Sequence, residues 1–219
     1  MRLKMFGVVV AVCLSIMATV LAGLTPAQTT KVKFEPIPAG EFRIDTAHSV
    51  VAFAIRHNEI ALVRGRFRDF SGKINYDDKD ITKSSVEVTA KVESINTGVD
   101  RRDAHLRTAD FFDVAKYPEM TFKSTRVEKK RNSQYVLHGD LTLRGITKPV
   151  AIPFTVTGAI KDGQGNMRFG VAGQTTINRR DFGFTWGKTM ANGGLDVGNE
   201  VMIDLQLEAV KPAPKPPVS

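Results

Sequence analysis

Four histidines, His48, His57, His105 and His138, are the candidates for acid–base or metal chemistry in this sequence. None has a second metal-type ligand at the spacing typical of zinc sites, so the sequence predicts no metal centre. Ser49 is only a sequence neighbour of His48, and no nucleophile motif of the Gly-x-Ser-x-Gly kind occurs. We therefore expect neither catalytic residues nor a cofactor.

The chain begins with the basic residues Arg2 and Lys4, followed by an uncharged run over 5–24. This pattern, with small residues before Gln28, predicts a cleaved signal peptide over 1–27 and a periplasmic or secreted protein. An anchor in the inner membrane formed by residues 5–24 is the alternative, since about 20 apolar residues span a bilayer. The only cysteine, Cys13, lies in this segment, so the cleaved chain forms no disulfide.

The remaining chain is basic, but its charge is dispersed. Removal of 1–27 takes away Arg2 and Lys4 and no acids, so the formal charge falls from +8 to +6. No aromatic stacking platform accompanies the basic residues, and we therefore expect no nucleic-acid partner. Residues 28–40 are predicted to be a linker, residues 41–210 one folded domain, and residues 211–219 a disordered Pro-rich tail.

Strand patterns dominate the predicted domain. Apolar and polar residues alternate over 135–143 and again over 150–156, with a break at 145–147 that predicts a long β-hairpin. Similar patterns begin near Phe42, Val51, Arg64, Val86, Met120, Met167 and Val201. A change of parity between Phe67 and Phe70 predicts a bulge near Asp69. The sequence thus predicts eight or nine mostly antiparallel strands.

One segment departs from this pattern. Residues 99–115 read as one or two short helices, with Thr97 or Asp100 as the N-cap. Closing the strands into a barrel would remove both exposed edges, and the helical segment would then cover one end as a lid. An eight-stranded barrel is either filled by side chains or able to hold one small ligand.

Several motifs, in order, resemble the YceI-like family of exported lipid-binding proteins. They include Phe42-Arg43-Ile44-Asp45, Gly65-Arg66-Phe67, the run from Arg102 to Phe112, and the run from Gly139 to Val150, and the similarity extends from Phe42 to Ala209. The resemblance implies an all-β fold, a single elongated lipocalin-like antiparallel barrel whose interior holds a polyisoprenoid chain such as a quinone tail or its precursor. Some relatives hold fatty-acyl amides. The stretch from Asn178 to Asn199 varies in length in the family, so Trp186 is not transferred as a ligand contact.

The alternating patterns and this resemblance together give the candidate ligand-binding residues. The predicted pocket walls are Phe53, Ile55, Phe67, Val88, Val92, Leu106, Phe111, Phe112, Phe122, Leu137, Leu141, Phe154, Phe169 and Val171. The predicted head-group or rim residues are His48, His57, Arg102 and His105. For each wall residue, ordinary core packing is the competing interpretation.

We therefore predict a barrel that binds a long isoprenoid or acyl lipid without catalysis. Transient membrane contact and a homodimer are both compatible with the sequence. Two alternatives remain open: an enzyme that uses His48 or His57 as general base on a lipid or amide, and a structural or stress protein without a ligand.

Overall fold

The computed structural model describes residues 32–213. The expected signal peptide or anchor lies outside this range, as do residues 28–31 of the expected linker and residues 214–219 of the expected tail. The compact unit that holds the barrel begins at Phe34. Within the described range, no helix has both the length and the apolar content that a membrane span requires.

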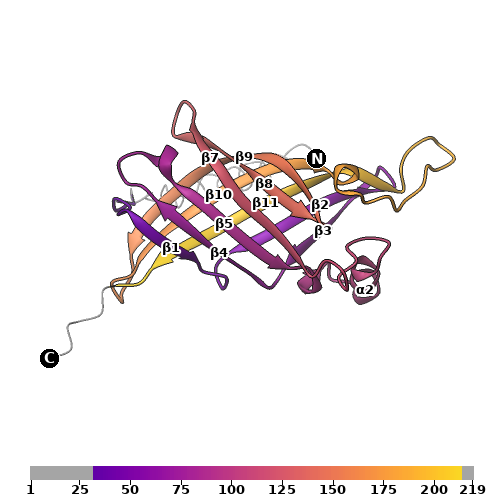
Figure 1. The fold of residues 1–219 in the computed structure, drawn as a ribbon, viewed down its shortest axis with the longest axis horizontal. Coiled ribbons are helices and arrows are strands. Elements are labelled where there is room, and N and C mark those ends of the chain that lie inside the picture. Colours follow the sequence, from indigo (N-terminus) through magenta and orange to yellow (C-terminus); the bar gives the residue numbers. More distant parts are fainter. Residues whose placement is uncertain (1–31, 214–219) are drawn as a thin grey trace, which may run out of the picture. The chain divides into compact units, whose positions relative to one another are not determined.

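Eight antiparallel strands form the barrel, which confirms the predicted fold class. They pair in the order β1-β4-β5-β7-β8-β9-β10-β11, and β11 pairs back with β1 to close the sheet (Figure 1). The strands are β1 (Gly40–Ile44), β4 (Phe70–Tyr76), β5 (Ser85–Lys91), β7 (Glu119–Lys129), β8 (Gln134–Leu143), β9 (Ile146–Lys161), β10 (Met167–Asn178) and β11 (Val197–Lys211). Three further strands, β2 (Val50–His57), β3 (Ala61–Phe67) and β6 (Ile95–Asn96), extend the sheet from β11.

The predicted hairpin is the pair β8–β9, in which Leu143 opposes Ile146. The turn consists of Arg144 and Gly145, both with positive φ (48° and 71°), as a two-residue hairpin turn requires. Ten residues in β8 and sixteen in β9 make this one of the longer parts of the wall. The alternation over 135–156 therefore predicted the hairpin, but the predicted break at 145–147 lies too late, because Ile146 and Thr147 already belong to β9.

Three consecutive strands bend at the same level of the barrel. The chain breaks between β1 and β2 at residues 45–49, between β3 and β4 at residues 68–69, and between β5 and β6 at η3 (Val92–Ser94). The breaks at Asp69 and η3 are joined, because the Lys91 amide donates to the Asp69 carbonyl at 2.9 Å. The predicted irregularity near Asp69 is thus part of a bend shared by neighbouring strands.

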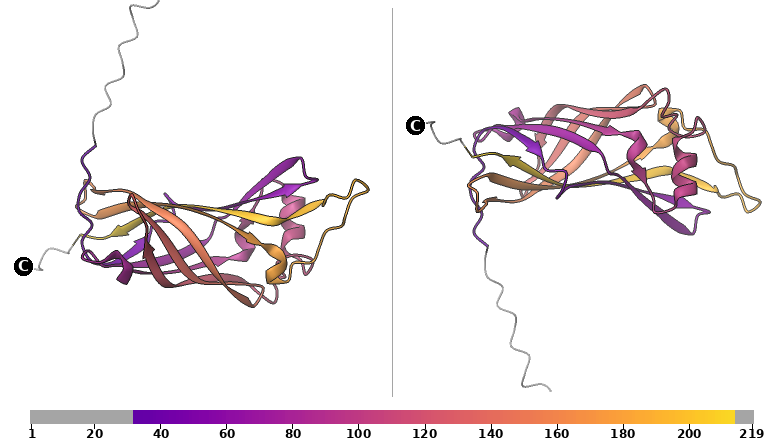
Figure 2. Two further views of the ribbon diagram at one scale, coloured as in Figure 1. Left: turned by 90° about the horizontal axis from the view of Figure 1, so that it is seen from above. Right: turned by 90° about the horizontal axis from the view of Figure 1, so that it is seen from below.

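Beyond this bend, β2, β3 and β6 diverge from the closed half, and helix α2 (Asp100–Arg107) lies at that end (Figure 2). The predicted N-cap is wrong: Val99 occupies the cap position and makes no side-chain cap hydrogen bond. Thr97 is engaged elsewhere, because its amide and hydroxyl both donate to the buried Asp103 carboxylate. We call this the α2 end of the barrel.

The opposite end is closed by packed side chains. Phe42 and Phe169 are almost fully buried, and their rings meet edge to face at 4.9 Å. Ile74, Ala159 and Ala209 complete this cluster, against which Tyr76 packs. Because β1, β4, β9, β10 and β11 all contribute, the cluster fastens the first strand of the barrel to the last.

Candidate functional site

An apolar cavity of about 390 Å³ occupies the barrel interior. This volume lies within the range of ~300–1,000 Å³ that is usual for small-molecule sites. Thirteen of the fourteen predicted wall residues line it: Phe53, Ile55, Phe67, Val88, Leu106, Phe111, Phe112, Phe122, Leu137, Leu141, Phe154, Phe169 and Val171. Their contact with a ligand stays a prediction, but their shared orientation makes the interior the candidate binding site.

Val92 is the predicted wall residue that does not line the cavity. It is only 2% exposed and packs in a core cluster with Phe67, Phe70 and Ile95. The alternation that begins in β5 predicted an inward side chain, but the chain turns into η3 at Val92. The alternation of a strand no longer applies there, and the Val92 side chain packs in the core cluster at the bend instead of facing the cavity.

The charged residues of the lining are basic and lie toward the α2 end. Arg56, His57, Arg102, His105 and Arg179 line the cavity, and among the described residues no aspartate or glutamate does. The predicted rim residues His57, Arg102 and His105 are thus brought together. An acceptor-rich head group would meet hydrogen-bond donors here and no competing carboxylate.

Arg102 is positioned by the residues that precede α2. Its Nε donates to the Thr97 hydroxyl at 2.7 Å, and its Nη2 donates to the Thr97 carbonyl at 2.9 Å. The same hydroxyl donates to Asp103, which is 2% exposed. Buried Asp103 therefore fixes Thr97, and Thr97 holds the Arg102 guanidinium beside the cavity.

His105 belongs to an aromatic cluster over the mouth. Its ring packs edge-on against Phe111 at 5.1 Å and Trp186 at 5.3 Å, and Phe111 and Trp186 lie 5.0 Å apart. His105 Nε2 is 2.8 Å from the Asp110 carboxylate. The structure thus places Trp186, which the resemblance did not identify as a ligand contact, in the cavity lining.

Arg179 is the site residue that the sequence interpretation missed. It is 4% exposed, and its guanidinium donates to the carbonyls of Gly198 at 2.8 Å and Val197 at 3.1 Å. No carboxylate forms an ion pair with it within the described part of the chain. Burial and then repulsion from Arg180 lower the pKa of the guanidinium. The alternation along β10 was the signal that could have identified Arg179, because Phe169, Val171 and Ile177, at the same alternate positions, also face the cavity.

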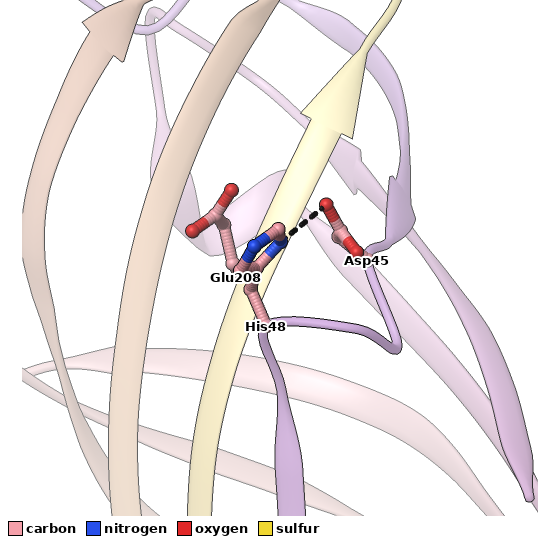
Figure 3. Close-up of side chains that lie close together, drawn as sticks. All are labelled: Asp45, His48 and Glu208. Atoms are coloured by element: carbon pink, nitrogen blue, oxygen red, sulfur yellow. Dashed lines mark hydrogen bonds and ion pairs between the residues drawn. The ribbon is translucent and has the colours of Figure 1, made fainter.

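His48, predicted at the rim, lies instead on the outside of the barrel. Its side chain is 64% exposed, and Nδ1 is 3.0 Å from Oδ2 of Asp45 (Figure 3). The bend between β1 and β2 accounts for the error, because it places His48 in a turn where strand alternation does not apply. His138, on the polar face of β8, likewise pairs with Glu128 at 3.0 Å.

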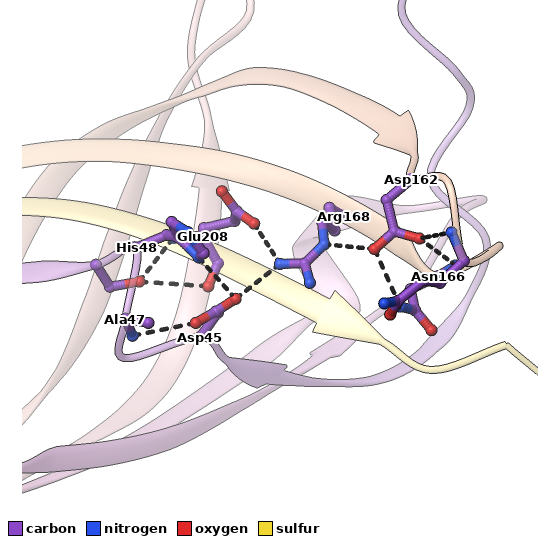
Figure 4. A network of polar contacts seen from close by, with 9 residues as sticks. Asp45, Ala47, His48, Asp162, Asn166, Arg168 and Glu208 are labelled. Carbon is purple, nitrogen blue, oxygen red and sulfur yellow. Dashed lines mark hydrogen bonds and ion pairs between the residues drawn. The ribbon is translucent and has the colours of Figure 1, made fainter.

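An ion-pair network surrounds His48. Arg168 on β10 contacts Asp45 at 2.7 Å, Glu208 at 2.5 Å and Asp162 at 2.8 Å (Figure 4). Hydrogen bonds from Arg168 and then His48 lower the pKa of Asp45 to about 2. The network ties the β1–β2 bend to β11 and to the turn between β9 and β10.

The same atoms include a potential metal-ligand set. One ligand atom each from Asp45, His48 and Glu208 lies within 4.8 Å of the others. However, the Arg168 guanidinium already pairs with both carboxylates, and a metal ion would have to displace it. We therefore interpret the cluster as a structural ion-pair network.

Comparison with known proteins agrees with the fold. A model of the YceI-like domain matches residues 42–209. A UPF0312 protein of Vibrio cholerae is 42% identical over 147 residues, which cover 66% of this chain and 78% of that protein. BcnA of Burkholderia cenocepacia superimposes with a TM-score of 0.65 and 26% identity, covering 75% of this chain and 98% of that chain. A polyisoprenoid-binding domain from Saccharophagus degradans shares the fold, with a TM-score of 0.58 and 17% identity over 80% of this chain and all of that one. The resemblance recognised in the sequence is confirmed: the chain belongs to the YceI-like family.

Proposed function

We propose that this protein binds a long isoprenoid or acyl lipid non-covalently inside the barrel. The observation that carries the proposal is the apolar interior cavity, which is closed by Phe42 and Phe169 at one end and has its basic side chains at the other. Membership of the YceI-like family supports it, as does the fold shared with a polyisoprenoid-binding domain.

The apolar lining favours a long chain over a short one. Burial of ten CH₂ equivalents contributes roughly 8 kcal/mol before costs. Association and ordering cost ~4–15 kcal/mol. A short chain would therefore hardly bind, whereas a prenyl chain of several units would bind without strong polar contacts.

We place the polar end of the lipid beside Arg102, His105 and Arg179. These side chains supply N–H donors, and the cavity lining of the described chain contains no acid. The matching ligand carries oxygen acceptors on a long apolar tail. A quinone, with its ring carbonyls, or its biosynthetic precursor satisfies this description.

Binding without catalysis fits the site better than an enzyme does. Of the two candidate general bases, His48 lies outside the cavity and is paired with Asp45. His57 lines the cavity but takes part in none of the side-chain hydrogen bonds of the described residues. No side chain is therefore seen to hold His57 in the orientation that a general base requires.

We further propose that the protein is exported by its N-terminal segment and acts in the periplasm or outside the cell. The basic start, the apolar run and the small residues before Gln28 support this. N-terminal sequencing of the protein from its host tests it. A mature terminus near Gln28 is expected, and an intact Met1 on membrane-bound protein would mean a retained anchor instead.

Organic extraction of gently purified protein, followed by mass spectrometry, tests the proposed function. We expect a stoichiometric apolar chain that bears an oxygen-containing head. Protein without extractable lipid that also takes up no added isoprenoid would favour a structural or stress role. If the added lipid is converted on long incubation and His57→Ala abolishes the conversion, the enzyme alternative is correct.

A further inference from the structure

Exposed apolar side chains gather at the α2 end of the barrel. From Phe34 onward, seven large apolar residues of the described chain are exposed, and five of them lie at this end. They are Ile60 (84% exposed), Val99 (47%), Leu62 (37%), Trp186 (37%) and Ile146 (36%). The two others, Phe34 and Ile160, lie toward the closed end. The exposed apolar surface is therefore concentrated around the mouth.

Contacts between three segments hold these side chains on one surface. The β2–β3 turn, which carries Ile60, is bonded to the loop after η4 (Arg179–Phe182), because Asn58 donates to the Asp196 carbonyl at 2.9 Å. Trp186 in the same loop packs on His105 of α2, and Val99 is the N-cap of that helix. Figure 2 shows the hairpin, the helix and the loop together at this end.

Basic side chains are interspersed among the apolar ones. Arg56 and Arg64 flank the β2–β3 turn, Arg101 follows Val99 closely, and Lys188 follows Trp186. All four are exposed, and none forms an ion pair with another described residue.

Acidic residues are present at this end as well. Glu59 accepts from the Leu195 amide, Asp110 contacts His105, and Asp196 accepts from the Lys188 amide, while Asp100 and Asp181 are exposed. These acids keep their charge, but basic residues outnumber them, because Arg102, Arg144, Arg179 and Arg180 lie at the same end as the four basic residues above. The net charge at this end is therefore positive.

We propose that the α2 end docks on the surface of a bilayer that contains anionic phospholipid. Apolar side chains among lysines and arginines are the composition of interfacial membrane-binding surfaces. Basic residues are attracted to anionic head groups, and tryptophan favours the head-group layer. The inference rests on the proposed function, because docking at the mouth lets a lipid pass between bilayer and cavity without crossing water.

Trp186 is the only tryptophan in the chain, so the tryptophan fluorescence reports on this surface and receives no contribution from residues 1–31. We would titrate the full chain with phosphatidylcholine vesicles with and without phosphatidylglycerol, carrying brominated acyl chains as quenchers. Quenching is expected with the anionic vesicles and should weaken as salt screens the basic residues. Removal of the vesicles should restore the fluorescence.

The variant Ile60→Asp/Val99→Asp removes two apolar contacts that do not line the cavity. The fold should survive, because Ile60 is 84% exposed and aspartate is a favourable N-cap at position 99. We expect its partition onto anionic vesicles to fall at least about tenfold. Ile160→Asp, which changes an exposed residue toward the closed end, is the matched control and should bind as the unmodified chain does.

Unchanged quenching in the double variant, or an equal loss in the control, would overturn the docking proposal. So would a concentration-dependent dimer that the double variant abolishes, since the surface would then bind a second copy of the chain. Uptake of a soluble isoprenoid without vesicles tests the proposed function separately. If uptake persists while vesicle binding is absent, only the docking proposal is wrong. Quenching that survives removal of the vesicles would report brominated lipid inside the cavity and not docking.

Discussion

Asp45 illustrates how one carboxylate contributes to the stability of the outer ion-pair network. Its pKa is lowered to about 2, chiefly by Arg168, relative to the usual value of about 3.9. A lowered pKa means that the stabilisation is present above about pH 4 and is lost as the pH falls through about 2. We expect Asp45→Asn to lower the free energy of unfolding at pH 7 by about 1–2 kcal/mol. The estimate is modest because Arg168 keeps Asp162 and Glu208.

Chemical denaturation of the variant between pH 7 and pH 2 measures this effect. The difference between Asp45→Asn and the unmodified chain should shrink toward pH 2. Asp78→Asn, which changes an exposed aspartate without an ion pair among the described residues, should behave as the unmodified chain at every pH. A constant difference over the whole range would mean that the amide disturbs the β1–β2 bend itself.

Arg179 is expected to discriminate between head groups. Lysine at this position keeps the charge but loses the planar set of donors. A hydrogen bond to a charged group contributes about 1.5–3 kcal/mol, so Arg179→Lys should weaken a lipid with an oxygen-rich head about tenfold or more. A hydrocarbon of equal chain length should bind as before. Isothermal titration with both ligands measures this difference. The matched control is Arg180→Lys, because Arg180 bonds to Asn199 and the Thr185 carbonyl. Equal losses for both ligands would assign Arg179 a purely structural role.

At the residue scale, alternation in regular strands placed most of the predicted wall residues correctly in the cavity lining. Phe53, Leu141 and Val171 lie in uninterrupted strands, so their inward orientation follows from a period of two. His48 and Val92 could not be placed in this way, because each lies where a strand bends. The bends depend on contacts between strands distant in sequence, such as that between Lys91 and Asp69.

At the element scale, the segment from α2 to residue 115 remains the best candidate for the entrance. Its only buried helical residue is Asp103, so little apolar burial holds the helix. Its polar attachments include the bonds of Asp103 and Arg102 to Thr97, those of Arg107 to the carbonyls of Glu93 and Ile95, and that of Arg144 to the Ala109 carbonyl. Little apolar burial in the helix and several replaceable hydrogen bonds suit a movable lid, whose apolar contacts to the barrel come mainly from Phe111 and Phe112 after the helix.

We expect amide hydrogen exchange over residues 99–115 to be faster than in β8–β11 without lipid, and slower after loading. Exchange measured by mass spectrometry on both forms tests this. The strands β8 and β9 are the internal control, because their ladder should be protected in both forms. Equal protection of 99–115 and the strands would make the segment a fixed part of the core, and the entrance would then lie at the loop 187–199.

Phe111 links the lid to the mouth, and its replacement should act mainly on release. Phe111→Ala removes the contacts to His105 and Trp186, so we expect bound lipid to dissociate about tenfold faster. The control is Phe169→Ala at the closed end, where loss of a buried ring costs about 3–5 kcal/mol. Phe169→Ala should lower the melting temperature more than Phe111→Ala does, but it should change the rate of lipid release less. A faster release in the control than in Phe111→Ala would place the exit at the closed end.

Element types were predictable where the local signal was strong, as for the β8–β9 hairpin and the helix near residue 100. The N-cap was not, because Thr97 was expected to cap the helix from outside but is held by Asp103 from within it. The bonds from Thr97 to Asp103 join residues six positions apart, a spacing that no local sequence pattern predicts. The closure of β1 on β11 likewise pairs residues near the two ends of the domain.

At the scale of the whole barrel, the sequence left open whether the interior is filled or hollow. Glycines within strands could mark space for a ligand or for a neighbouring side chain. Beside Gly65 the space is taken by the Phe53 ring, and beside Gly139 by the Phe122 ring, since a Cβ on either glycine would lie 2.4 Å from a ring atom. These glycines therefore admit rings of the wall. The cavity results from the balance of all inward side chains, which no single residue reveals.

The length of the cavity should set the length of chain that the protein accepts. Val171 faces the cavity on β10, two residues from the Phe169 that closes the end. Val171→Phe places a ring in the path of the chain and occupies the space of about one isoprenoid unit, which would otherwise contribute roughly 4 kcal/mol before costs. Affinity should then stop rising about one unit earlier in a series of isoprenoids of increasing length. Ala172→Phe, on the neighbouring residue that faces outward, is the matched control and should leave the series unchanged. If both variants follow the unmodified chain, the lipid does not reach the closed end, and the binding site is confined to the half of the barrel beside α2.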